Sequence, residues 1–85
     1  SPVQPAVPKK HLLISVFSNP GKASVVVLND SDARENLSLT VDTRKLGLEN
    51  TRGGTELISG KPCMIRSGKL ESEIGPRGLE IFLFD

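Results

Sequence analysis

The sequence predicts an all-β protein, a small antiparallel β-sandwich of about seven short strands with one helical turn near residues 42–48. Two observations predict this fold class. Apolar and polar residues alternate along most segments, which is the period of a strand with one buried face. Turn-forming Gly, Pro, Asn and Asp recur about every 8–12 residues, which is typical of an antiparallel sandwich.

Composition limits the classes of protein to which this chain can belong. Leu, Ile, Val and Phe total 26 of 85 residues, too many for a disordered chain. Eleven basic and ten acidic residues are interleaved, so no strong field would attract nucleic acid or anionic lipid. No apolar run approaches the ~18 residues of a membrane span, and a single Cys excludes an intrachain disulfide and a Cys-based zinc site. We therefore expect one small domain with no nucleic-acid partner and no membrane span.

Residues 1–10 hold three of the six prolines. Proline restricts φ and has no N–H, so this spacing favours an extended segment over a helix or a central strand. We interpret residues 1–10 as a Pro-rich linker or a tail left by cloning, and residues 11–85 as the β-sandwich domain. A linker at this place suggests a domain cut from a longer protein.

The first two strands form a predicted hairpin. Over residues 12–17 the apolar positions Leu12, Ile14 and Val16 share one face. Residues 19–22 have the composition of a tight turn, with Pro and Gly adjacent. Residues 23–28 are almost wholly β-branched or aliphatic, so we expect a central strand buried on both faces. The polar residues 29–32 then favour a turn.

The remaining elements are shorter. Residues 36–41 alternate, and Asp42 is placed to cap one helical turn that ends at Gly47. Residues 52–54 are expected to be irregular. Four short strands separated by turns are predicted over residues 55–58, 63–66, 70–74 and 79–84.

Residues 54–61 look at first like a phosphate-binding loop, because two glycines precede a lysine. The motif requires four residues between the glycines and Ser or Thr after the lysine. Here five residues separate Gly54 from Gly60, and Pro62 follows Lys61. No helix pattern follows either. We therefore exclude a phosphate loop and expect no cofactor.

Three carboxylates, Asp30, Asp32 and Glu35, lie within six residues, and calcium prefers clustered oxygen ligands. The segment lacks the glycine and the distant glutamate of a helix–loop–helix calcium site. A solvated turn that caps its own backbone explains the same residues better. We therefore assign no metal site.

His11 and Cys63 are the only histidine and the only thiol. A catalytic Cys–His pair needs both side chains within hydrogen-bond reach and a third group that orients them. His11 lies beside the predicted linker and Cys63 in a short strand, so a surface histidine and a buried structural cysteine are the better interpretation. No serine lies in a nucleophile elbow. We expect no catalytic residue in this chain.

The aromatic residues are three Phe, with no Trp and no Tyr. Sugar-binding modules usually present flat Trp or Tyr platforms, so carbohydrate binding by this domain is disfavoured. Phe82 and Phe84 share one face of the last strand, with Phe17 as a candidate neighbour. Core packing explains them better than a binding platform, and an interface patch is the alternative.

Asn29 and Asn36 each begin an N-glycosylation acceptor pattern. Two accidental matches are unsurprising in a chain with four asparagines. The pattern has meaning only for a protein secreted through a eukaryotic pathway.

Several motifs, taken in order, resemble those of a known family. They are the hairpin Phe17-Ser-Asn-Pro-Gly-Lys-Ala-Ser-Val-Val-Val-Leu-Asn-Asp-Ser-Asp32, the segments Leu37-Ser-Leu-Thr-Val-Asp42 and Lys45-Leu-Gly-Leu48, the element Glu56-Leu-Ile-Ser-Gly60, and Gly68-Lys-Leu70 with Gly75-Pro-Arg-Gly-Leu-Glu-Ile-Phe82. Together they resemble the small antiparallel β-sandwich that closes many retaining glycoside hydrolases after their (β/α)8 barrel. The resemblance covers nearly all of residues 11–85.

The resemblance implies a non-catalytic C-terminal accessory domain, packed against an upstream catalytic barrel of the same polypeptide. In such enzymes the catalytic carboxylates lie on the barrel. The positions that carry over are structural, namely Asn29, Gly60, Pro76 and Gly78. Carbohydrate metabolism and an extracellular or periplasmic location would follow from the resemblance alone. The chain by itself would not be an enzyme.

An independent immunoglobulin-like binding or adhesion module that contacts protein or carbohydrate is the competing interpretation. The two differ in the surface that they predict. An accessory domain separated from its barrel should expose an apolar patch larger than the few hundred Å² common on monomers, with Phe82 or Phe84 as candidate members. A concave polar groove would favour the binding module.

Overall fold

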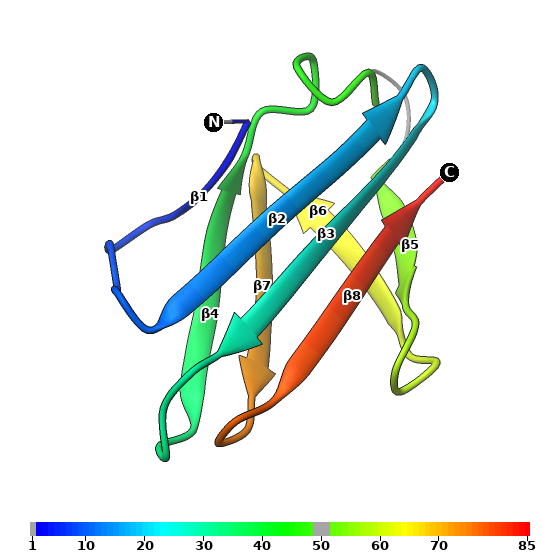
Figure 1. Cartoon of the computed structure of the whole chain (residues 1–85). Helices are drawn as coiled ribbons and strands as arrows, with labels where there is room; N and C mark the ends of the chain where they lie inside the picture. Colours follow the sequence, from blue (N-terminus) through cyan, green and yellow to red (C-terminus); the bar gives the residue numbers. More distant parts are fainter. Residues whose placement is uncertain (1, 49–51) are drawn as a thin grey trace.

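A computed structural model of the chain describes residues 2–48 and 52–85, which form eight antiparallel strands (Figure 1). The strands are β1 (Val3–Pro5), β2 (Leu12–Asn19), β3 (Lys22–Asn29), β4 (Glu35–Val41), β5 (Gly53–Glu56), β6 (Pro62–Arg66), β7 (Lys69–Ile74) and β8 (Leu79–Phe84). The described residues contain no helix. The predicted all-β class is therefore confirmed.

All eight strands belong to one sheet with the order β1-β4-β7-β6-β5-β8-β3-β2. Strand β6 lies at the bend, because its first residues pair with β5 and its last two, Ile65 and Arg66, pair with β7. The sheet therefore curls almost into a barrel, with β2, β3 and β8 on one side and β1, β4 and β7 on the other (Figure 1). The predicted sandwich of two separate sheets is not confirmed.

The core lies between the two sides of the curled sheet. Its members alternate along each strand with outward residues, which follows from the two-residue period of a strand. Phe82 and Phe84 are among the most buried side chains, as the preference for core packing predicted. The other buried apolar residues are Val3, Leu12, Ala23, Val25, Val27, Leu37, Leu39, Val41, Leu46, Leu48, Ile65, Leu70 and Ile74.

Strand β1, which the sequence did not predict, lies in the Pro-rich segment of residues 1–10. Residues 3–5 pair with β4 as edge strand β1, and the side chain of Val3 is buried in the core. The Asp42 N–H donates to the carbonyl of Pro2, and the Ala6 N–H to that of Ser38. The segment is extended, as its prolines predict, and proline is tolerated at a sheet edge. The prediction that residues 1–10 form a separate linker did not anticipate that residues 3–5 join the sheet.

Residues 42–48 form hydrogen-bonded turns and no regular helix, and in one of these turns the Leu46 N–H donates to the carbonyl of Asp42. Asp42 caps them as predicted, since its Oδ1 accepts the N–H of Lys45 at 3.2 Å. Gly47 has φ +72°, a conformation that only glycine adopts without strain, and it ends the turn where the sequence predicted. The Gly47 carbonyl accepts the N–H of Gly21 at 3.1 Å, which ties this segment to the β2–β3 turn.

Strand β5 begins earlier than predicted. Gly53 and Gly54, expected to be irregular, lie in β5, and the chain turns after Glu56. A Cβ on Gly54 would lie 2.2 Å from the carbonyl oxygen of Leu83, so only glycine permits this close approach of β5 to β8. Sequence patterns do not reveal such a contact, because it joins residues far apart in the chain.

Asn29 joins the two loops at the far end of β3. Its side chain is fully buried, and Nδ2 donates to the carbonyls of Ala33 at 2.7 Å and Gly75 at 2.9 Å. Its Oδ1 accepts the hydroxyl proton of Ser31 at 2.8 Å, and its backbone N–H donates to the carbonyl of Gly78. One side chain therefore satisfies the β3–β4 loop and the β7–β8 loop together. Its burial also makes Asn29 inaccessible to glycosylation in the folded domain, whereas Asn36 is exposed.

We predict that Asn29→Ala lowers the free energy of unfolding by about 2 kcal/mol, because the buried Asn29 side chain makes the hydrogen bonds that join the two loops. Urea denaturation followed by circular dichroism would measure the change. Asn36→Ala is the matched control, and as an exposed substitution it should change stability by less than about 0.5 kcal/mol. Equal effects of the two substitutions would contradict the role given to Asn29.

Candidate docking face

Beyond the polar pair Asn19–Lys22 at the hairpin turn, the outward side of β2, β3 and β8 is mainly apolar. The strand register places outward residues in three rows across these strands: Leu13, Leu28 and Leu79; Ser15, Val26 and Ile81; Phe17, Ser24 and Leu83. We call these nine residues the apolar face. None of the nine is charged.

The apolar face is open to solvent. Phe17 is 63% exposed, Leu13 51%, Leu79 43% and Leu28 37%. The prediction that residues 23–28 are buried on both faces is therefore wrong for this chain alone, since the core covers only the inner side of β3. Exposed apolar residues gather on this side of the sheet, and their aromatic member is Phe17 and not Phe82 or Phe84, which are buried.

The opposite side of the molecule differs in chemistry. Strands β4 and β7 direct polar residues outward, and the register pairs them in three rows: Asn36 with Glu73, Ser38 with Glu71, and Thr40 with Lys69. A sheet face that meets water normally carries such residues. The contrast identifies the apolar face as the unusual surface of this domain.

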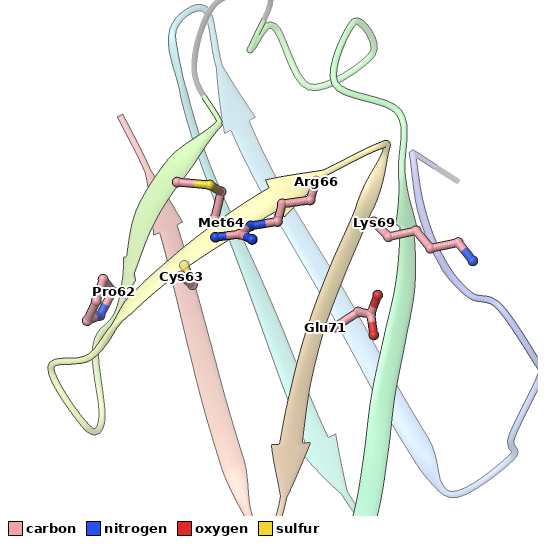
Figure 2. Close-up of a pocket in the computed structure, with 6 residues that line it drawn as sticks. All are labelled: Pro62, Cys63, Met64, Arg66, Lys69 and Glu71. Atoms are coloured by element: carbon pink, nitrogen blue, oxygen red, sulfur yellow. The ribbon is translucent and has the colours of Figure 1, made fainter.

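A hollow of about 490 Å³ lies over β6 and β7 on the polar side (Figure 2). The two cationic side chains at this hollow point in different directions. Arg66 extends along β6 toward Met64, whereas Lys69 extends away over β4 (Figure 2). Burial raises the pKa of the Cys63 thiol, and the carboxylates of Glu56 and Glu80 raise it further. A protonated thiol is a poor nucleophile, so this hollow offers no activated group.

His11 and Cys63 have separate environments. The imidazole Nε2 of His11 lies 2.8 Å from Oε1 of Glu35 in β4. Cys63 lies in β6 opposite Gly54. Among the residues that the structure describes, no hydrogen bond joins the two, so the geometry of a catalytic pair is not formed.

The three clustered carboxylates do not converge on one point, because they have different partners. Arg77 binds Asp30, and its Nε donates to Oδ1 of Asp32 at 3.0 Å. Glu35 instead binds Lys9 at 2.6 Å together with His11. These ion pairs tie the N-terminal segment to β4 and the β3–β4 loop to the β7–β8 loop. Within residues 2–48 and 52–85, no group of His, Cys, Asp or Glu side chains is placed to hold a metal ion.

Glu56 is a buried carboxylate whose structural role was not predicted from the sequence, in which it was only a possible further ligand to a cation. Its Oε2 accepts the N–H groups of Ile58 at 2.9 Å and Ile81 at 2.8 Å, and its Oε1 accepts that of Ser59 at 2.7 Å. Burial by itself raises the pKa of Glu56, but these backbone donors together outweigh burial and lower it. Burial and the Glu56 charge raise the pKa of nearby Glu80, although its bond from Ser72 opposes the shift. The sequence feature that could have indicated this role is that Glu56 lies just before a tight turn. Gly60 in that turn has φ +75°.

Comparison with known proteins leaves the chain unassigned: no family model matches it, and no curated protein matches it. The described residues include no helix long and apolar enough to cross a membrane. The candidate site therefore depends on the geometry of the domain itself.

We predict that Glu56→Gln lowers the free energy of unfolding near neutral pH by about 2 kcal/mol, because an amide cannot accept three N–H groups equally well. The lowered pKa in the folded state means that Glu56 stabilises the fold above its unfolded pKa of about 4.3. This contribution is lost as the pH falls through the folded pKa.

Urea denaturation at a series of pH values would test both parts of this prediction. The Glu56→Gln protein should lose less stability on acidification than the unsubstituted protein. Glu71→Gln, at an exposed position of β7, is the matched control. A Glu56→Gln protein with unchanged stability and unchanged acid sensitivity would contradict the role of this carboxylate.

Proposed function

We propose that this chain is a non-catalytic accessory domain whose apolar face packs against another folded domain. The observation that carries the proposal is the contrast between the apolar face, whose nine residues carry no charge, and the polar outer side of β4 and β7. Exposed apolar surface gains about 25 cal/mol per Å² when it leaves water. A contiguous patch of this kind typically marks an interaction site.

The composition of the apolar face favours a protein partner over a sugar. Its members are mainly aliphatic, and Phe17 is its one aromatic side chain. Sugar-binding surfaces usually present flat Trp or Tyr rings with a polar group beside the ring, and the chain contains no Trp and no Tyr. An aliphatic sheet face instead suits close packing against a second apolar surface.

The sequence resemblance supplies the proposed partner. It suggests an upstream (β/α)8-barrel glycoside hydrolase domain in the same polypeptide, so turnover would occur on that domain. The ion-paired carboxylates and the protonated Cys63 are compatible with a structural role for this chain.

We predict that Leu79→Ser leaves the isolated domain folded but weakens its docking, because Leu79 belongs to the apolar face and is 43% exposed in the domain alone. In the natural full-length polypeptide, the amides of β8 should exchange with deuterium more slowly than in the isolated domain. Leu79→Ser should remove that extra protection. Thr40→Ala on the polar face is the matched control and should leave it unchanged.

Equal exchange of β8 in the isolated domain and in the full-length polypeptide would refute docking through this face. The proposal also includes that this domain does not bind sugar. Calorimetric titration of the domain with a panel of oligosaccharides, with and without calcium, tests this second point. We expect no heat of binding. Saturable binding to any sugar would instead favour the independent binding module.

A further inference from the structure

The two ends of the sheet differ in how well they resist pairing with another strand. Within the described residues, β1 and β2 each pair with one neighbour only. Strand β1 has three residues and ends in Pro5, so it offers little to an incoming strand. Strand β2 has eight residues, without proline and without a charged side chain. Natural edge strands are usually interrupted by such residues to prevent association.

Strand β2 is also regular. It pairs with β3 residue for residue from Leu12–Asn29 to Asn19–Lys22, with no bulge. The N–H of Asp30 donates to the carbonyl of His11, which sets the odd-numbered residues of β2 as those that exchange hydrogen bonds with β3. The N–H and C=O groups of Ile14, Val16 and Ser18 therefore point toward the open edge.

We propose that two copies of this chain associate through β2, antiparallel and edge to edge, about a two-fold axis at Val16. Val16 then faces Val16 of the second copy, and Ile14 faces Ser18. Each of these pairs exchanges two backbone hydrogen bonds across the axis. The result joins the β8-β3-β2 side of each copy into one continuous sheet.

The occupant is a second copy because this edge is self-complementary. In a two-fold dimer, β2 of one copy lies beside β2 of the other copy. A charge on this strand would therefore lie close to the same charge on the second copy and repel it. Strand β2 has no charge to repel. On the outward side, the same register sets the small Ser15 opposite the large Phe17, and Leu13 opposite Asn19. No two large side chains collide across the axis.

The dimer does not depend on the proposed function. Docking uses the face of β2, β3 and β8, whereas the dimer uses the edge of β2. Dimerisation would extend the apolar face across two copies and leave it exposed. Each proposal can therefore fail while the other holds.

Sedimentation equilibrium from micromolar to near-millimolar concentration would measure the association. We expect a reversible dimer. Ser15→Lys should raise its dissociation constant at least tenfold, because the two lysines would lie diagonally across the axis. Ser15 is exposed, so the fold should tolerate the change. Ser24→Lys is the matched control: it makes the same substitution on the same face, one strand away from the edge, and should leave the dimer intact.

Ser18 provides a second pair of variants. Ser18→Pro removes an N–H that points to the open edge, whereas Ser18→Ala retains it. Only the proline variant should weaken the dimer. Isotope-filtered NOEs in a mixed labelled sample should connect Val16 of the two copies. A monomer at every concentration, or intermolecular NOEs at Leu28 and Leu79 in place of Val16, would overturn the proposal. Leu79→Ser should leave the dimer unchanged, which separates this test from that of docking.

Discussion

A curled sheet of eight short strands encloses a core on its inner side, and the rest of the structure depends on that enclosure. Strand β8 completes it, because β8 lies between β3 and β5 and directs Phe82 and Phe84 inward. None of the other strands in residues 2–48 and 52–85 lies over the outer side of β3 and β8. A small domain buries a smaller share of its surface than a large one. The open apolar face is a direct consequence.

Polar groups buried at the margins hold the loops of this small core in place. Asn29 serves the β3–β4 and β7–β8 loops, and Glu56 serves the turn after β5 together with the start of β8. In each case one side chain replaces several bonds to water, which leaves the backbone groups satisfied. These residues are used by the fold, so their polarity does not indicate catalysis.

Much of the fold was predictable because strand alternation and turn chemistry are local properties. The β2–β3 hairpin, the inward residues of β4, and the cap at Asp42 with its terminal Gly47 all follow from neighbouring residues. The pairing of residues 3–5 with β4 was not predictable from neighbouring residues, because a proline-rich segment is expected to be extended whether or not it pairs with another strand. Nor was the early start of β5, which depends on Gly54 lying against Leu83.

Composition and strand alternation were enough to predict an all-β chain of balanced charge, with apolar residues on both faces of the segment 25–28. Which of the apolar residues are covered depends on the packing of the strands. Period-two alternation assigns Leu79, Ile81 and Leu83 to the side of β8 opposite Phe82 and Phe84, but it does not say which side is inside. The strand order decides that, because it places β3 beside β8 and turns their common outer side away from the core. Burial depends on contacts between distant strands, and alternation within one strand carries no information about them.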